Sequence, residues 1–366
     1  MSPDSLFRPF TLKSLTLKNR CVMAPMTRSF GTDGVLPAAS VDYYRKRAIG
    51  EVGLIVSEGT VVGRPAASAY PGVPHFHGDA ALAQWQAVVA AVHGAGGKMA
   101  PQLWHMGVVK AHESGWLPPG PLEGPSGLLV SGQPAGGTMT TQDIEATIAA
   151  FATAAADAKR LGFDCLELHG AHGYLIDQFL WDKTNERHDR YGGNSLAART
   201  RFGIEIVKAV RQAVGEDFVI IQRLSQWKLS DYDAKLAKTP AELAAWLTPF
   251  AEAGVDIFHC SQRRFWEPEF AGSDLNLAGW AKKVTGRPTI TVGSVGLSGE
   301  FTAAFRGESS VPHALDELIR RHERGDFDLV AVGRALLADP DWVAKIHGGR
   351  TDELQGFTRD VLQTLS

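Results

Sequence analysis

The chain has 366 residues, of which 44% are hydrophobic and 21% charged, and its formal net charge is -3. These are the proportions of a globular protein that can bury a sizeable core, and the mild charge gives no broad attraction to nucleic acid or anionic membranes. The opening residues lack a basic region followed by an apolar core, and no run approaches the roughly 18 apolar residues of a membrane span. We therefore expect a cytoplasmic protein with neither a nucleic-acid nor a membrane partner.

The three cysteines, Cys21, Cys165 and Cys260, are far apart in the chain and form neither a CxxC pair nor a cluster with histidine. Each lies inside an apolar run, where a buried reduced thiol is the expected state. The sequence therefore predicts no cysteine-based metal site.

The predicted elements begin with residues 7–20, whose alternating apolar residues favour a hairpin that closes the floor of the fold. Eight short apolar runs follow, bounded by Gly, Pro or polar residues, at 21–26, 53–59, 98–105, 164–170, 218–225, 255–262, 288–295 and 328–334. Helical patterns lie between most of them, for example at 79–96, 143–162, 199–215 and 239–254. Continuous apolar strands that alternate with amphipathic helices indicate parallel strands covered by helices. Eight such units fit a (β/α)8 TIM barrel, with residues 1–366 as a single domain, better than two doubly wound domains.

Two long connections interrupt this pattern. Residues 106–141, rich in Gly, Pro and Ser, follow the third predicted strand, and residues 263–280 follow the sixth. Long loops at the carboxyl ends of barrel strands usually form the rim of the active site. We therefore expect both inserted loops on the C-terminal face of the barrel.

Glycines lie in the loops after the seventh and eighth strands, at 293, 296 and 333, and these loops are the usual phosphate site of the fold. Glycine lets backbone N–H groups approach a phosphate closely, and Arg334 can bind it through two charge-assisted hydrogen bonds. We therefore predict a phosphate site that includes Ser294. The alternative is that these glycines only turn the chain.

A phosphate ligand is either a substrate or the tail of a cofactor, and two side chains at other strand ends favour the cofactor. Gln102 offers a donor and an acceptor to an amide–imide edge such as that of a flavin ring. Arg223 can stabilise negative charge on a reduced ring. Taken alone, each is equally compatible with an ordinary polar group at the rim.

The stretch HGAHGYLIDQFL (169–180), continued by NERHDRYGG (185–193) and RTRF (199–202), resembles the core signature of the old yellow enzyme family. Further segments match the same family in order, and these are 24–27, 58–60, 101–104, 223–225 and 333–334. The resemblance implies a barrel with non-covalent FMN, which NADH or NADPH reduces and which then reduces the activated C=C bond of an enone or related alkene. It also suggests a homodimer.

The resemblance implies roles for individual residues. FMN contacts are implied for Ala24, Pro25, Met26, Thr27, Gly59, Gln102, Arg223, Gly333 and Arg334. His169 and His172 match the pair that binds the substrate's carbonyl oxygen, and Tyr174 matches the proton donor. The sequence departs from the family pattern at Val108, at Ala198 and at 181–184, which bears on substrate identity more than on flavin binding.

The hexapeptide HGAHGY (169–174) has three interpretations. A metal site needs a third and fourth ligand, and no HExxH motif or carboxylate partner supports one. The second interpretation is a set of satisfied polar groups at a strand end. In the third, two imidazole N–H groups stabilise an enolate while Tyr174, with an ordinary pKa near ~10, protonates the α-carbon. We favour the third interpretation and expect no metal.

Three aromatic residues complete the predicted substrate pocket. Trp104 is expected beside the flavin ring, and Tyr70 and Trp266 lie in long loops at the rim, although each is also compatible with ordinary packing.

Two other functions stay open. One is a flavin-free barrel that acts on a phosphate substrate, for which Glu58 is the obvious catalytic candidate at a strand end. The other is a flavin-binding protein without catalysis. Iron–sulfur relatives, the 2,4-dienoyl-CoA reductases, do not fit three scattered cysteines in a chain of this length. The sequence names neither the physiological substrate nor the preferred nicotinamide.

Overall fold

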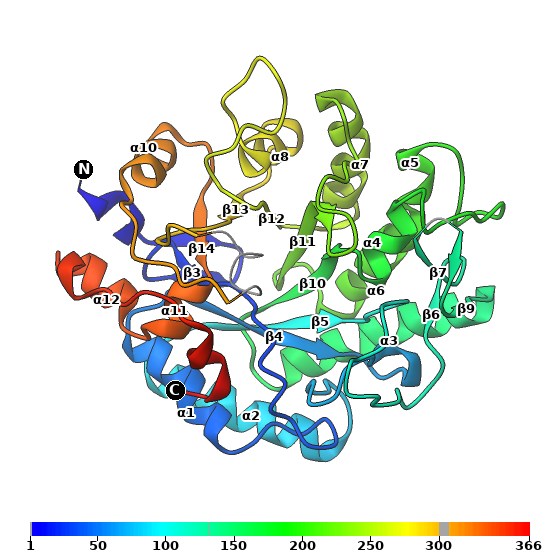
Figure 1. Cartoon of the computed structure of the whole chain (residues 1–366), viewed down its shortest axis with the longest axis horizontal. Helices are drawn as coiled ribbons and strands as arrows, with labels where there is room; N and C mark the ends of the chain where they lie inside the picture. Colours follow the sequence, from blue (N-terminus) through cyan, green and yellow to red (C-terminus); the bar gives the residue numbers. More distant parts are fainter. Residues whose placement is uncertain (1, 131, 300–306) are drawn as a thin grey trace.

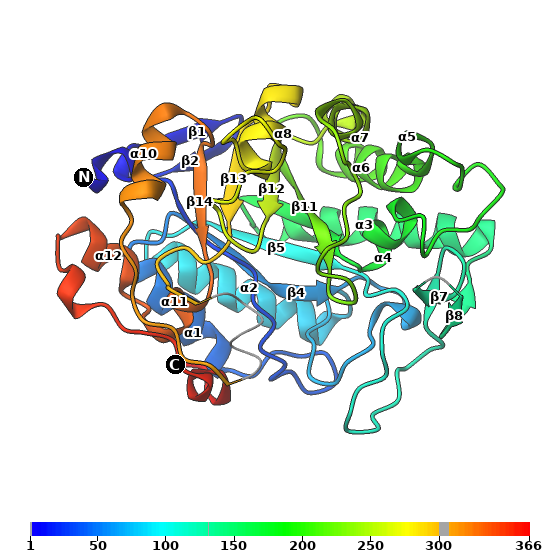
Figure 2. The same cartoon turned by 45° about the horizontal axis from the view of Figure 1, so that its top comes forward.

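A computed structural model describes residues 2–130, 132–299 and 307–366. Its centre is a closed barrel in which every pair of neighbouring strands is parallel, with helices around it (Figures 1 and 2). The strands, in order around the barrel, are β3 (Cys21–Met23), β4 (Leu54–Val61), β5 (Met99–Trp104), β10 (Cys165–His172), β11 (Val219–Lys228), β12 (Ile257–Ser261), β13 (Thr289–Val292) and β14 (Leu329–Val332). All eight predicted strands are present, and the (β/α)8 barrel is confirmed.

Helices cover the outside of the barrel. In the described part of the chain they are α1 (Ala39–Ile49), α2 (Asp79–Gly94), α3 (Thr141–Arg160), α4 (Leu175–Leu180), α5 (Leu196–Arg199), α6 (Arg201–Val214), α7 (Pro240–Ala253), α8 (Leu277–Thr285), α10 (Asp316–Arg324), α11 (Arg334–Ala338) and α12 (Trp342–His347). α3 and α7 each begin with a capping box, formed by Thr140 with Asp143 and by Thr239 with Glu242. None of the described helices is long and apolar enough to cross a membrane.

The opening segment forms the predicted hairpin, from β1 (Phe10–Leu12) and β2 (Leu15–Leu17), which pair antiparallel. Phe10, Leu15 and Leu17 are buried in one apolar cluster with inward-facing residues near the starts of the barrel strands. These strand residues are Val22, Leu54, Ala100, Cys165, Val219, Ile257, Ile290 and Leu329. The hairpin therefore closes the amino-terminal end of the barrel and forms its apolar floor.

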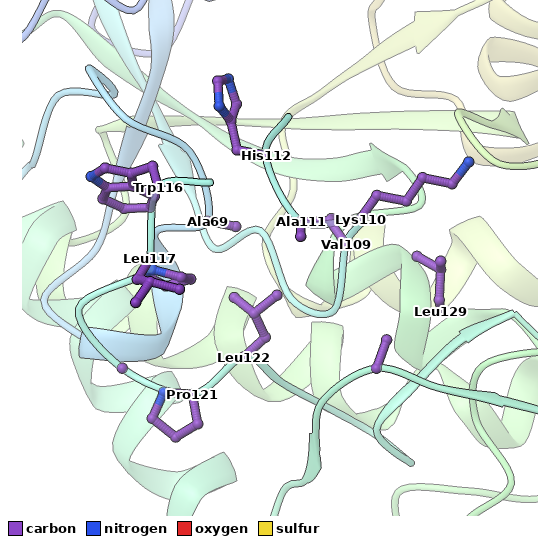
Figure 3. A pocket seen from close by; sticks show the side chains of 13 residues that line it. Ala69, Val109, Lys110, Ala111, His112, Trp116, Leu117, Pro121, Leu122 and Leu129 are labelled. Atoms are coloured by element: carbon purple, nitrogen blue, oxygen red, sulfur yellow. The ribbon is translucent and has the colours of Figure 1, made fainter. Parts of the chain in front are cut away.

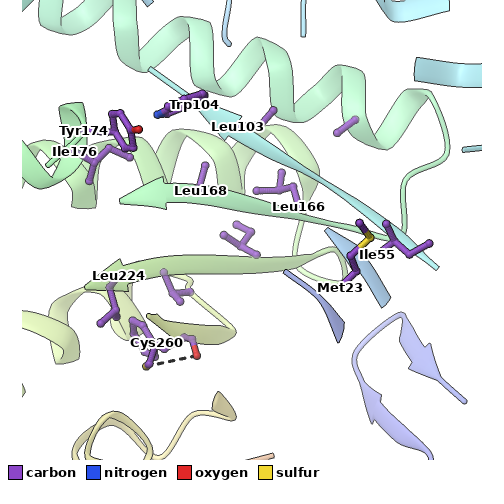
Figure 4. Close-up of a cluster of buried hydrophobic side chains, with 14 of the residues drawn as sticks. Met23, Ile55, Leu103, Trp104, Leu166, Leu168, Tyr174, Ile176, Leu224 and Cys260 are labelled. Carbon is purple, nitrogen blue, oxygen red and sulfur yellow. Dashed lines mark hydrogen bonds between the residues drawn. The ribbon is translucent and has the colours of Figure 1, made fainter. Parts of the chain in front are cut away.

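A second apolar cluster lies between the strands and the helices. Figure 4 shows Leu166 and Leu168 of β10 among its members, with Trp104 and Tyr174 at the end toward which β10 points. The three cysteines are buried free thiols, as predicted. Burial raises the pKa of the Cys21 thiol to about 12, so the side chain stays protonated and inert.

The inserted loop 106–141 has structure of its own at the carboxyl end of β5. β6 (Glu123–Gly124) pairs with β9 (Gly137–Thr138), and β7 (Leu128–Val130) pairs with β8 (Gln133–Pro134). The C-terminal segment packs back against α1, where Arg47 donates to the carbonyl of Ser366 at 2.6 Å (Figure 1). Arg28 donates to the carbonyl of Thr364 at 2.6 Å, so the chain's last residues fix the loop that follows β3.

Two strands depart from regular geometry near their carboxyl ends. The register of β4 against β5 shifts between Val56 and Gly59, and the register of β10 against β11 shifts between Gly170 and His172. β11 extends three residues beyond the predicted end, to Lys228. These irregularities change which side chains face the barrel interior at the site described below.

Removing side-chain volume from the floor is expected to destabilise the barrel. Leu17→Ala should lower the free energy of unfolding by about 2–5 kcal/mol, because a fully buried leucine leaves a cavity that the hairpin cannot fill. Thr16→Ala, on the exposed face of the same strand, is the control. Urea unfolding followed by circular dichroism measures both, and equal losses would contradict the assignment of the floor.

Candidate active site

Inward-facing side chains of four strands form a polar layer above the apolar floor. Gln102 of β5 lies level with Glu167 of β10, and Arg223 of β11 lies level with both His169 of β10 and His259 of β12. We call Gln102, Glu167, Arg223 and His259 the polar layer. All four residues are buried, and none is more than 5% exposed. The barrel therefore holds two charged groups and two polar groups away from water.

Hydrogen bonds connect this layer through the carboxylate of Glu167. Nε2 of Gln102 donates to Oε1 of Glu167 at 2.8 Å, and Nδ1 of His259 lies 2.6 Å from Oε2. Nη1 of Arg223 lies 4.0 Å from Oε1. Burial raises the pKa of Glu167, but His259, Arg223 and Gln102 together lower it below its ordinary value, so the carboxylate is ionised.

Several N–H groups around this layer fit a ligand that brings hydrogen-bond acceptors. Nε and Nη1 of Arg223 are buried and have no hydrogen-bond partner among the described residues, and the same holds for Nε1 of Trp104. Buried donors of this kind are normally paired in proteins. The residues present therefore fit FMN, whose ring edge carries carbonyl oxygens and an imide, with Gln102 and Arg223 from the two strands that flank β10 to hold it.

Gly59 and Gly333 keep space beside these groups. A Cβ on Gly59 would lie 2.5 Å from Cε3 of Trp104, so only glycine lets the indole pack against the backbone there. At Gly333 the nearest atoms to an added Cβ are Sδ of Met26 at 3.6 Å and Cβ of Ala24 at 4.0 Å. The ends of β3 and β14 thus meet, as the predicted cofactor contacts require.

The segment after β3 is held by Glu58. Its Oε2 accepts N–H groups from Arg28 at 3.0 Å and Ser29 at 3.4 Å, and its Oε1 lies 3.5 Å from the hydroxyl of Tyr44 in α1. Burial raises the pKa of Glu58 to about 7. The side chain therefore positions the loop that carries Pro25, Met26 and exposed Thr27. This placement gives no support to Glu58 as a catalytic group.

The loops after β13 and β14 also meet. Oγ of Ser294 and Nη2 of Arg334 both donate to the carbonyl oxygen of Gly299, at 3.3 and 2.7 Å, and the Arg334 guanidinium lies over the ring of Phe357. Ser294 has a φ of 51°, a left-handed conformation that non-glycine residues rarely adopt. The two predicted phosphate ligands are thus neighbours.

The side chains of His169, His172 and Tyr174 come together at the end of β10. The ring of His169 lies 5.3 Å from that of His172 and 5.0 Å from that of Tyr174, centroid to centroid, and both contacts are edge-to-face. Trp104 packs against Tyr174 at 4.7 Å and against His169 at 5.6 Å. Two imidazoles and a phenol therefore surround one point above the polar layer.

Three contacts fix His172, whose φ of 66° is left-handed. Its backbone N–H donates to Oγ of Ser225 at 2.9 Å, and its ring stacks on Trp227 at 4.3 Å. Nε2 lies 2.8 Å from Oγ of Ser261. Trp227 in turn stacks on Tyr232 at 5.2 Å. The conformation is therefore determined by its surroundings rather than by local preference.

The turn after His172 depends on a buried ion pair. Nζ of Lys228 lies 2.7 Å from Oδ1 of Asp177, and neither side chain is exposed. Oδ2 of Asp177 accepts the backbone N–H of Gly173 at 2.7 Å. The pair thus joins α4 to the extension of β11 and holds Tyr174 at the start of α4.

Burial sets the protonation states of these groups. Burial lowers the pKa of His169 well below its ordinary value, and the charge of Arg223 lowers it further. Burial also lowers the pKa of His172 well below its ordinary value, and the charge of Arg223 adds to this decrease. Burial raises the pKa of Tyr174, and nearby Tyr70 adds to the increase. Near neutral pH both imidazoles are neutral donors and the phenol keeps its proton.

The two rim residues are placed differently. Tyr70 lies close enough to Tyr174 to affect its titration, and its ring is 5.8 Å from that of His112 in the inserted loop. The ring of Trp266 lies 5.0 Å from that of Phe265 and 6.4 Å from that of His313. The structure therefore does not bring Trp266 against the histidine pair. Its role in substrate binding stays a prediction.

The inserted loop, together with Ala69, borders an open apolar pocket of about 720 Å³, lined also by Val109, Trp116, Leu122 and Leu129 among others (Figure 3). His112 also lines it, so the pocket borders the rim at Tyr70. Neither the histidine pair nor the polar layer lines this space. Within the described ranges, no group of three His, Cys, Asp or Glu residues is arranged to hold a metal ion.

Sequence reasoning missed five residues of this site, which are Glu167, Trp227, Tyr232, His259 and Ser261. The alternation of side chains along a strand was a usable signal for three of them. Glu167 is two residues before His169, and His259 and Ser261 are alternate residues of β12. Trp227 and Tyr232 gave no such signal. Both follow residue 225, where the predicted strand ends, although β11 extends to Lys228.

Comparisons with known proteins agree with this fold. The sequence profile of the NADH:flavin oxidoreductase / NADH oxidase family matches residues 5–353. A 12-oxophytodienoate reductase 7 from Oryza sativa subsp. japonica is 33% identical over 93% of this chain and 87% of its own length. An NADH oxidase from Thermoanaerobacter brockii is 34% identical over 96% of this chain, which spans only 52% of that protein. The structure of morphinone reductase in complex with tetrahydroNAD superposes with a TM-score of 0.79 at 29% identity, covering 98% of this chain and 93% of that one.

The contact between Ser261 and His172 predicts a tautomer. The Ser261 hydroxyl has no other hydrogen-bond partner among the described residues, so we expect it to donate to Nε2 and to place the ring proton on Nδ1. ¹⁵N NMR of the histidine side chains should show this Nδ1–H form in the native protein and its loss in Ser261→Ala. Ser261→Thr keeps the hydroxyl and is the control. An Nε2–H form in the native protein would refute the assignment.

Proposed function

The chain belongs to the NADH:flavin oxidoreductase / NADH oxidase family, and on that premise we propose that it reduces the activated C=C bond of enones and related alkenes. It is an NAD(P)H-dependent flavin oxidoreductase of the old yellow enzyme type, with FMN as its cofactor. Bound FMN supplies hydride chemistry that no amino-acid side chain provides. The finer assignments below concern this chain's own residues.

The observation that carries the proposal is the meeting of two neutral imidazoles and a protonated phenol at the end of β10. His169 and His172 bind the carbonyl oxygen of the alkene by N–H donation, which stabilises the negative charge that develops there. Tyr174 gives its proton to the α-carbon. The high pKa of Tyr174 keeps this proton available across the neutral range.

We assign the cofactor to the residues around the polar layer. Gln102 and Arg223 hold the ring edge, and Gly59 and the 24–27 segment adjoin the ring. Ser294, Gly333 and Arg334 hold the phosphate. Trp104 and Tyr70 line the substrate side, next to Tyr174. In this arrangement residues 1–366 act as one FMN-binding unit.

Tyr174→Phe separates the two half-reactions. The variant keeps the ring and its packing on Trp104 but lacks the acidic proton, so enone reduction should slow by about 10²–10⁴-fold. Reduction of the flavin by NAD(P)H should be nearly unchanged, because no proton from Tyr174 is used. Stopped-flow absorbance measures each step, with Tyr191→Phe, whose hydroxyl bonds Glu205 away from this site, as the control. Equal slowing of both half-reactions would rule out the proton-donor role.

His172→Ala is expected to weaken ligand binding. Losing one hydrogen bond to a charged oxygen corresponds to about tenfold to hundredfold weaker binding of phenols. Titration of the flavin absorbance with a para-substituted phenol gives the Kd, and replacement of the exposed His188 by alanine is the control. Unchanged affinity for phenols and enones would show that His172 does not hold the substrate oxygen.

A further inference from the structure

We propose that Glu167, held in place by His259, is a positioning residue that orients Gln102, compensates the charge of Arg223 and thereby makes the reduction potential of FMN more negative. The proposal rests on the placement of FMN at Gln102 and Arg223 given above. Glu167 and His259 are fully buried, and the contacts given for the Glu167 carboxylate are with Gln102, Arg223 and His259. Their effect must pass through the residues that they contact.

The first step concerns the amide of Gln102. Its Nε2 donates to Oε1 of Glu167 at 2.8 Å, so the amide cannot rotate by half a turn without placing its oxygen against the carboxylate. Repulsion between two oxygens excludes that alternative. Glu167 therefore directs Oε1 of Gln102 away from itself as an acceptor, which is the group that an imide N–H of a flavin requires.

The second step concerns charge. Arg223 is 5% exposed and its guanidinium lies 4.0 Å from the Glu167 carboxylate. A buried guanidinium next to a flavin ring favours the reduced and more negative state of the ring. A buried carboxylate beneath it opposes that effect. Glu167 thus limits how strongly Arg223 stabilises the reduced cofactor.

The third step concerns His259, which is a neutral hydrogen-bond donor to Glu167. Its Nδ1 lies 2.6 Å from Oε2 of Glu167, and Nε2 has no hydrogen-bond partner among the described residues. Burial lowers the pKa of His259, so the ring is neutral and donates through Nδ1–H. A neutral donor holds the carboxylate while leaving its negative charge in place. A lysine or arginine at this position would cancel that charge.

Glu167→Gln tests the proposal in the FMN-loaded protein. The change keeps the shape of the side chain and removes its charge, so the two-electron reduction potential should become more positive. We expect at least a tenfold change in the equilibrium constant for reduction, which is about 30 mV for a two-electron couple. Dye-equilibrated spectrophotometric titration measures the potential without any alkene present.

Asp256→Asn is the matched control. Asp256 is also a buried carboxylate, paired with Arg211 at 2.5 Å, but it lies before the start of β12 at the floor end of the barrel. Its loss is expected to reduce stability and to leave the potential unchanged. If the potential shifts equally in Glu167→Gln and Asp256→Asn, it responds to the loss of any buried charge, and the proposal is overturned.

Variants of His259 keep the test decisive if Glu167→Gln does not fold or bind FMN. His259→Leu removes the donor to Oε2, which favours the protonated and uncharged form of Glu167 and should move the potential in the positive direction. His259→Asn keeps an N–H donor and should remain near the native value. Equal potentials in the native protein, Glu167→Gln and His259→Leu would overturn the inference.

Arg223→Gln separates this inference from the placement of FMN. If FMN lies at Arg223, this variant binds FMN more weakly and has a more negative potential. If the potential shifts in Arg223→Gln but not in Glu167→Gln, the role of Glu167 is refuted and the placement of FMN stands. No change of affinity or potential in Arg223→Gln refutes the placement itself.

Discussion

Keeping the carboxylate of Glu167 ionised inside a barrel requires partners, and the arrangement of the site follows from how they are supplied. A charge removed from water is costly unless hydrogen bonds and an opposite charge compensate it. β5 supplies Gln102, which is level with Glu167. β11 supplies Arg223 and β12 supplies His259, which are level with His169 and whose side chains reach the carboxylate. The strand that carries Glu167 also carries His169, so β10 joins the polar layer to the histidine pair.

The barrel interior is divided along its axis into zones of different polarity. The hairpin of β1 and β2 seals an apolar floor, the polar layer lies above it, and aromatic rings meet at the carboxyl ends of the strands. The positive charge of Arg223 reaches the upper zone, where it lowers the pKa of His169 and His172 beyond the effect of burial. Arg223 of the polar layer thus also favours the neutral form of both imidazoles.

Irregular backbone shapes the site where regular strands cannot. The shift in β4 brings Gly59 level with Gln102 and turns Glu58 toward α1, where it holds the loop after β3. The left-handed conformation of His172 turns its ring onto Trp227 instead of along the strand. Contacts from Ser225, Ser261 and the Asp177–Lys228 pair maintain this local strain.

The sequence by itself determined the eight strands, the floor hairpin, the inserted loops and the meeting of His169, His172 and Tyr174, because hydrophobic periodicity and short spacing within one strand end are local properties. It also placed Gln102, Arg223 and the 333–334 segment at the face where parallel strands end, which the fold class alone dictates. Only the tertiary structure decided that Glu167 and His259 face each other, that Ser261 meets His172, and that Glu58 leaves the interior. These outcomes depend on the relative height of strands far apart in sequence and on register shifts, neither of which any single segment encodes.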